Sequence, residues 1–116
     1  MMTQNELNDY LLSFDGSWLD LSTDPKLLIY RIGHESDGEK IFAAIEKDSR
    51  PIRLSLKCDS HLAIKLRQDY ETVLPSANLN KKYWNTIICS GQLSDEDVKS
   101  FIRLSYNLVT GATPQS

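Results

Sequence analysis

The sequence has few cysteines, no long hydrophobic run and no glycine-rich loop. Its two cysteines, Cys58 and Cys89, are too few for a disulfide scaffold, so we expect free thiols in a reducing cytoplasm. No apolar run approaches the roughly 18 residues that a membrane helix needs. The N-terminal MMTQNELNDYLL has early acidic residues and no basic segment, unlike a signal peptide. The isolated glycines do not form a phosphate-binding loop. We therefore expect a cytoplasmic protein.

Residues suited to metal or nucleophilic chemistry are equally scarce. The two histidines are His34 and His61, and only His61 lies near a cysteine, in a C-x-x-H spacing with Cys58. A structural zinc site needs about four ligands, and two close ones do not make a site. Cys58 precedes an expected helix N-terminus, a position that can lower a thiol pKa, but no third group would orient His61 as its base. We predict no metal, no cofactor and no enzymatic activity.

Charge is unevenly distributed along the chain. The net charge is −3 and the pI about 5.3, so the protein as a whole is not a basic nucleic-acid binder. Residues 50–83, however, hold seven Lys/Arg and three acidic residues, a local charge of +4 against −7 for the remainder. This distribution predicts a positive face on an acidic domain.

Three stretches carry helix signals. Thr3 and Glu6 form a T-x-x-E capping box before a stripe of Leu7, Tyr10, Leu11 and Phe14, which Asp15-Gly16 ends. Asp59 can cap a helix that runs to about Tyr70. Ser94 with Asp97 predicts a third cap. The long helix after it is ended by Gly111, and its expected apolar face contains Val98, Phe101, Ile102, Ser105, Leu108 and Val109. Ser105 on that face favours close packing of helix on sheet.

Short β-like runs separate these helices. Leu27–Ile32, Lys40–Glu46 and Ile52–Leu56 are joined by expected turns at His34–Gly38 and Lys47–Pro51, which indicates an antiparallel meander. Trp84–Cys89 is another strand, in which Trp84, Thr86 and Ile88 share one face. The sequence thus predicts a two-layer α+β fold, α-βββ-α-ββ-α, with about five antiparallel strands and helices packed on one face. We expect one domain over residues 1–110 and a frayed tail over 111–116.

Four stretches together resemble the MmcQ/YjbR-like family. They are GEKIFA (38–43), LSLKCDSHLAIKLRQDY (54–70), PSANLNKKYWNTI (75–87) and LSYNLV (104–109), in the family's order. The resemblance implies a compact α+β domain similar to type III secretion chaperones. Family members are often described as DNA-binding because of a proposed double-wing arrangement, so the resemblance also implies DNA binding. The family has no established enzymatic activity. The chain departs from the family's usual Pro-Gly-Tyr-His, since it has Pro75-Ser76-Ala77-Asn78, and Tyr83 stands where a histidine usually precedes the tryptophan.

The basic stretch supplies the candidate site. Contacts from basic side chains to the phosphates of double-stranded DNA are predicted, with stacking by Tyr83 or Trp84, and the basic candidates are Lys57, Lys65, Arg67, Lys81 and Lys82. The competing interpretation is structural: Trp84 enters the sheet and packs under the C-terminal helix, while the lysines form a solvated turn. Asn80 and Asn85 suit turn and strand-end hydrogen bonds. The alternative function is a protein-interaction or chaperone-like module that binds a polypeptide, which an acidic, motif-poor domain also fits.

Overall fold

A computed structural model describes residues 2–33, 40–77 and 79–111 of the chain. These residues form three helices and one six-stranded antiparallel sheet. The helices are α1 (Gln4–Leu12), α2 (Ser60–Asp69) and α3 (Asp95–Thr110). The strands are β1 (Ser17–Asp20), β2 (Leu27–Ile32), β3 (Lys40–Glu46), β4 (Ile52–Lys57), β5 (Val73–Pro75) and β6 (Trp84–Cys89).

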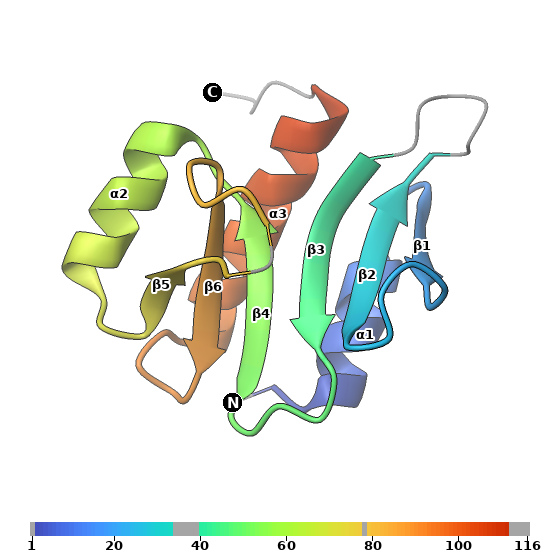
Figure 1. Cartoon of the computed structure of the whole chain (residues 1–116), viewed down its shortest axis with the longest axis horizontal. Coiled ribbons are helices and arrows are strands. Elements are labelled where there is room, and N and C mark those ends of the chain that lie inside the picture. The colour runs from blue at the N-terminus through green and yellow to red at the C-terminus, as the bar shows by residue number, and fades with distance from the viewer. Residues whose placement is uncertain (1, 34–39, 78, 112–116) are drawn as a thin grey trace.

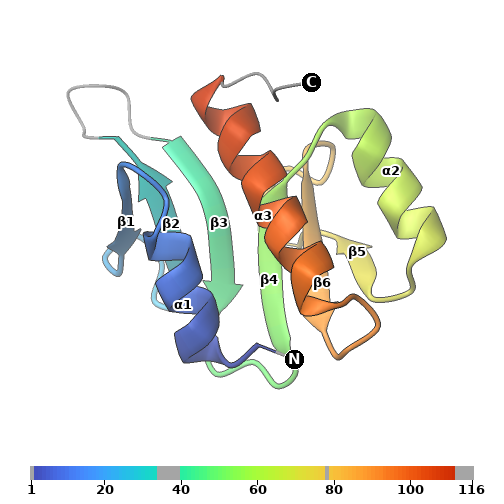
Figure 2. The same cartoon turned by 180° about the vertical axis from the view of Figure 1, so that it is seen from behind.

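The sheet has the strand order β1-β2-β3-β4-β6-β5, and one of its faces is covered by helices. Figure 1 shows the face that no described helix crosses, and Figure 2 shows α1 and α3 lying across the other face. Helix α3 packs on β3 and β4, α1 packs on β1, and α2 lies beyond the β5 edge. The predicted α+β class and helices on one face are therefore confirmed.

The helix ends follow the predicted capping chemistry. Thr3 and Glu6 form both bonds of the capping box, since each side chain accepts from the other's backbone N–H at 3.1 Å. The Asp59 carboxylate accepts from the N–H groups of His61 and Leu62, and Ser94 accepts from that of Asp97. At the far end of α3, Gly111 has a φ of 74°, a left-handed conformation that favours glycine.

Strand register separates the two faces of the sheet. Leu54 pairs with Ile87 and Ile45, and all three are buried in the core beneath the helices. The next register position, Ser55, pairs with Thr86 and Ala44 and faces the other way. The Ser55 and Thr86 hydroxyls hydrogen-bond to each other at 2.8 Å on this second face. The predicted alternation of Trp84, Thr86 and Ile88 against Asn85, Ile87 and Cys89 is consistent with this pairing.

Several predictions of detail differ from the structure. The sheet gains β1, whose Trp18 and Leu19 were not predicted as a strand because the run is only four residues long. Leu108 is 45% exposed, so it does not belong to the buried face of α3. The predicted turn at His34–Gly38 lies outside the described residues, as does the expected tail beyond Gly111.

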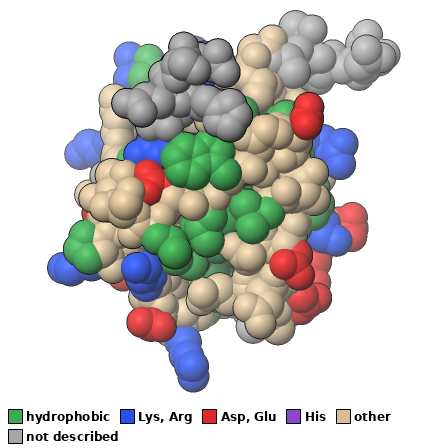
Figure 3. Space-filling model, turned by 90° about the vertical axis from the view of Figure 1, so that its right-hand side faces the viewer, with side chains coloured by type: hydrophobic (Ala, Val, Ile, Leu, Met, Phe, Trp, Pro, Cys, Tyr) green, Lys and Arg blue, Asp and Glu red, His purple; other side chains and the backbone are tan. Residues whose placement is uncertain are grey.

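The β1 side of the sheet exposes apolar surface. Among the described residues β1 pairs only with β2, which makes it an edge strand. Its Trp18 and Leu19 are half-buried, and hydrophobic side chains gather in a patch in the middle of this side of the molecule (Figure 3). An apolar patch at an unpaired strand edge is a common feature of interaction surfaces.

A β-bulge in β3 directs an aromatic side chain into the core. Tyr30 pairs with Ala43, whereas its neighbour Arg31 pairs with Ile41, so Phe42 has no partner on β2. The Phe42 side chain is fully buried and its ring packs edge-on against Phe14, which follows α1, and Tyr106 of α3. The bulge thus joins the sheet to both helices of the covering layer.

Ser105 of α3 links two strands where their direct pairing ends. The pairing of β3 with β4 runs from Ile45–Leu54 to Ala43–Leu56 and ends there. One position further, the Ser105 hydroxyl accepts from the Lys57 N–H at 3.0 Å and donates to the Phe42 carbonyl at 2.6 Å. Ser105 is fully buried, so no water is available to these two backbone groups. The Ser105 hydroxyl therefore replaces one direct hydrogen bond between β3 and β4.

A buried carboxylate organises the turn after β1. Asp20 accepts hydrogen bonds from the Thr23 hydroxyl (2.6 Å), the Ser22 hydroxyl and N–H, and the Arg31 guanidinium (2.7 Å). These bonds, that of Thr23 foremost, hold the pKa of Asp20 far below its usual value of 3.8. The folded state therefore favours the ionised form.

Asp20→Asn should lower the urea midpoint at pH 7, because the amide cannot accept the same set of hydrogen bonds. A lowered folded-state pKa gives stability that is complete above pH 3.8 and is lost as the pH falls from there through the folded pKa. The difference between wild type and variant should accordingly shrink between about pH 4 and pH 2. Urea titrations at several pH values measure it, with the exposed Asp9→Asn as control. A difference that does not depend on pH would contradict this assignment.

No helix among the described residues is both long enough and apolar enough to cross a membrane.

Candidate nucleic-acid interface

The turn before β6 presents the two predicted lysines to solvent. The side-chain Oδ1 of Asn80 accepts from the Lys82 N–H at 3.0 Å, and the backbone carbonyl of Asn80 accepts from the Tyr83 N–H at 3.1 Å. This asparagine turn, predicted from the sequence, leaves Lys81 and Lys82 exposed. The Tyr83 carbonyl accepts from the Cys58 N–H at 2.6 Å, which fixes the turn to the end of β4.

Two further predicted cations lie next to this turn. Lys57, the last residue of β4, is opposite Trp84, the first residue of β6, so it lies next to the turn that precedes β6. Arg67 of α2 donates from Nη1 to the Lys81 carbonyl at 3.4 Å and from Nε to the Ala63 carbonyl at 3.2 Å. We refer to Lys57, Arg67, Lys81 and Lys82, together with the 39% exposed Tyr83, as the basic cluster.

Not every predicted residue joins the basic cluster. Lys65 instead forms an i,i+4 ion pair with Asp69 at 3.1 Å on the exposed side of α2. Lys82 places its ammonium 5.5 Å from the centroid of the Tyr83 ring, a cation–π distance. Tyr83 is thus the exposed aromatic of the cluster.

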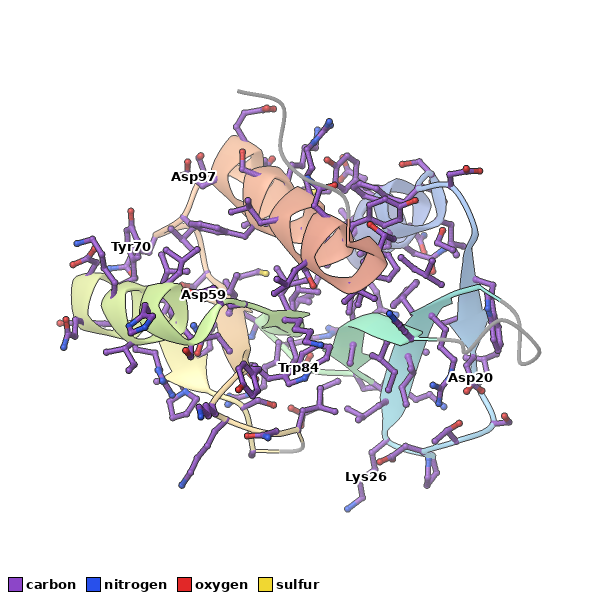
Figure 4. All side chains as sticks on the ribbon, turned by 90° about the horizontal axis from the view of Figure 1, so that it is seen from above. Asp20, Lys26, Asp59, Tyr70, Trp84 and Asp97 are labelled. Carbon is purple, nitrogen blue, oxygen red and sulfur yellow. The ribbon has the colours of Figure 1, made fainter. Side chains whose placement is uncertain are left out.

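The position of Trp84 corrects one prediction and bears out another. The side chain is only 8% exposed, as the structural interpretation requires. It does not pack under α3, however, because its register with Lys57 turns it to the opposite face of the sheet, away from α3 (Figure 4). A ring buried there is not available to stack on a base, which leaves that role to Tyr83.

Asn85 does more than a strand-end hydrogen bond. It shares the helix side of β6 with Ile87, and its Nδ2 donates to the Ala63 carbonyl of α2 at 3.1 Å. Its Oδ1 is buried and has no partner among the described residues. The sequence signal for this residue is a polar side chain at an inward position of a strand, which does not by itself distinguish a site from a strand-end hydrogen bond.

The cysteines have environments that disfavour the thiolate. Burial raises the pKa of both Cys58 and Cys89 to about 11, and a nearby aspartate adds to the effect in each case. The α2 N-terminus could lower the pKa of Cys58, but desolvation outweighs that effect, and both thiols are half-buried. Among residues 2–33, 40–77 and 79–111, no three His, Cys, Asp or Glu side chains are grouped as metal ligands.

Both thiols should react slowly with Ellman's reagent in the folded protein. A pKa of about 11 against an ordinary value of 9.0 lowers the thiolate fraction at neutral pH about 100-fold. The reaction rate of the folded protein should rise roughly tenfold per pH unit between about pH 7 and pH 9. When the protein is unfolded in urea, the rate should equal that of free cysteine. A thiol as reactive as free cysteine at pH 7 in the folded state would contradict this.

Comparisons with known proteins place this arrangement in a family. The YjbR family model matches residues 12–108, which is well over half of the chain and includes the basic cluster. The chain belongs to the YjbR family. It is 30% identical over 115 residues to the uncharacterised protein YjbR of Escherichia coli strain K12, covering 98% of this chain and 92% of that protein.

Two solved structures share the fold of this YjbR-family chain. The crystal structure of the Deinococcus radiodurans protein DR2400, with the domain DUF419, superimposes with a TM-score of 0.87 and 31% identity over 95% of this chain and 80% of that one. A Pseudomonas syringae protein superimposes with a TM-score of 0.75 over 93% of this chain and 99% of its own, at 23% identity. The second supports the fold alone. The resemblance seen in the sequence motifs is thereby confirmed.

Proposed function

We propose that this YjbR-family protein is a small non-enzymatic binding domain that contacts double-stranded DNA through the basic cluster. The observation that carries the proposal is that β4, α2 and the turn before β6 bring four cations close to one another, with Lys82 over the ring of the exposed Tyr83. Lysine and arginine side chains neutralise phosphates, and an exposed aromatic ring can stack on a base.

The charge balance sets the character of this binding. Since the whole chain carries −3, the cluster acts locally against an acidic background. Four phosphate contacts give a slope of log affinity against log salt of about −3.6, which is roughly a hundredfold loss of affinity between 50 and 200 mM salt. We expect weak, salt-sensitive binding with little sequence preference, because phosphate contacts carry no sequence information.

Lys81→Ala with Lys82→Ala should weaken DNA binding about tenfold at 50 mM salt and reduce the salt slope by about 1.8. Fluorescence anisotropy of a labelled random-sequence duplex, at several salt concentrations, measures both quantities. The matched control is Lys26→Ala with Lys47→Ala. These two lysines are next to the Leu27–Glu46 pair of β2 and β3, at the end of the sheet opposite to the basic cluster. Equal affinity of wild type and the Lys81/Lys82 variant, or equal loss in the control, would refute this interface.

A protein-interaction role is the second candidate, and the apolar β1 edge favours it. An unpaired edge strand can accept a strand from a polypeptide partner, including a second copy. Sedimentation velocity across a wide concentration range, combined with hydrogen exchange of the β1 amides, tests the self-association form. Concentration-dependent dimers with newly protected β1 amides would support it. A monomer at every concentration, with unchanged protection of the β1 amides, would exclude it.

A further inference from the structure

An apolar groove runs between α2 and α3, separate from the turn that carries Lys81 and Lys82. Its outer part holds about 150 Å³ between Leu62 of α2 and Leu104 and Leu108 of α3. A deeper part of about 20 Å³ continues from it, since Leu62 and Leu104 line both, and reaches Phe101 and Asn85. Leu104 and Leu108 are 42% and 45% exposed, so the outer wall is open to solvent.

Asn85 supplies an unused acceptor at the base of this groove. Its side chain is 3% exposed, and its Nδ2 donates to the Ala63 carbonyl, which fixes the amide orientation. A flipped amide would place two oxygens against each other, so Oδ1 is the atom left without a partner among the described residues, and Asn85 is one of the residues that line the deep part. A buried acceptor without a partner destabilises the fold. This fold therefore retains an acceptor that a hydrogen-bond donor entering the groove would satisfy.

We propose that the α2–α3 groove binds a small amphipathic molecule, an aromatic or branched aliphatic body carrying one hydroxyl or N–H donor. The body lies between Leu62, Leu104 and Leu108, and the donor reaches Asn85 Oδ1. An apolar cavity of about 150 Å³ holds a benzene-sized body, and the deep part has room for one further polar group the size of water. Benzyl alcohol has this size and this arrangement of groups. Lys57 of the basic cluster also lines this groove, but no step of the inference uses DNA binding.

The test compares two ligands that differ in the donor. Benzyl alcohol should bind with a Kd near 1 mM and shift the Asn85 side-chain amide signal in ¹H–¹⁵N spectra. Benzyl methyl ether has the same ring and an oxygen acceptor but no donor, and it should bind about tenfold more weakly. This comparison leaves the protein unaltered, so it does not depend on a variant that folds.

A groove-filling variant locates the site. Leu104→Trp places a larger side chain on the groove wall and should abolish benzyl alcohol binding. The control is Leu12→Trp on α1, where the replaced leucine is 39% exposed, close to the 42% of Leu104. Urea midpoints establish that both variants are folded. Leu12→Trp should bind benzyl alcohol as wild type does.

Each contrary result overturns the proposal. Equal affinity for the alcohol and the ether would remove Asn85 as the recognising acceptor. An Asn85 signal that does not move at saturating benzyl alcohol would place the ligand elsewhere. Unchanged binding in a folded Leu104→Trp variant would do the same. A bound water that persists at Asn85 Oδ1 in the saturated complex would show that the acceptor serves solvent alone.

Discussion

Replacing Ser105 with alanine should lower the free energy of unfolding by about 2–4 kcal/mol, a large effect for the loss of one oxygen atom. The reason is that its hydroxyl serves two backbone groups at once, accepting from the Lys57 N–H and donating to the Phe42 carbonyl. Alanine leaves both without a partner in a site from which water is excluded, because Ser105 is fully buried. Each orphaned polar group costs roughly 1–3 kcal/mol.

Urea denaturation followed by far-UV circular dichroism measures this effect. The matched control is Ser100→Ala, which removes the same hydroxyl from an exposed position of the same helix and should change the unfolding free energy by less than about 0.5 kcal/mol. Hydrogen exchange adds a local readout, because the Lys57 amide should exchange much faster in Ser105→Ala. A variant as stable as the control, with Lys57 still protected, would show that α3 does not bridge β3 and β4.

Local signals in the sequence were enough for most of the elements. Capping residues act on atoms two or three residues away, so Thr3, Asp59 and Ser94 could be assigned to helix starts without tertiary information. The runs at 27–32, 40–46 and 84–89 became strands with those same bounds, because β-branched and aromatic residues bounded by turns have few other solutions.

What the sequence missed depends on contacts between distant segments. The four residues of β1 form a strand because β2 offers a free edge, and the run alone is too short to indicate it. A period of two places Phe42 on the face opposite to Ala43, yet the bulge turns its ring to the helices. The alternation along β6 was right, but which face α3 covers depends on the whole topology, so Trp84 was assigned to the wrong side.

The candidate site shows the same division. The local charge of residues 50–83 identified Lys81 and Lys82, and the Asn80 turn exposes them as expected. Arg67 joins them only through a hydrogen bond across 14 residues of chain, and Lys65 is held by Asp69 instead. The α2–α3 groove depends on how two helices separated in sequence approach Asn85, and no local pattern specifies such a distance.

Phe42→Ala should destabilise the protein by about 3–5 kcal/mol, the usual cost of removing a buried phenyl ring. The ring is fully buried and meets Phe14 at 5.9 Å and Tyr106 at 5.7 Å between centroids, both edge-on, so its loss leaves a cavity between the sheet, α1 and α3. Tyr83→Ala removes an exposed ring and is the control, with an expected change below about 1 kcal/mol. Urea denaturation measures both, and a Phe42→Ala effect no larger than the control's would contradict the role of the bulge.

The two destabilising substitutions should not be additive. Ser105 donates to the carbonyl of Phe42, and the buried ring holds the bulge that aims this carbonyl at α3. Once the ring is removed the bulge can relax, and the Ser105 hydroxyl loses part of what it contributes in the wild type. The double variant should therefore be less destabilised than the sum of the single effects by about 0.5–3 kcal/mol, the range found for residues that share a contact. Strict additivity would mean that the carbonyl keeps its position without the ring, and that the helix hydroxyl alone holds β3 and β4 together at this point.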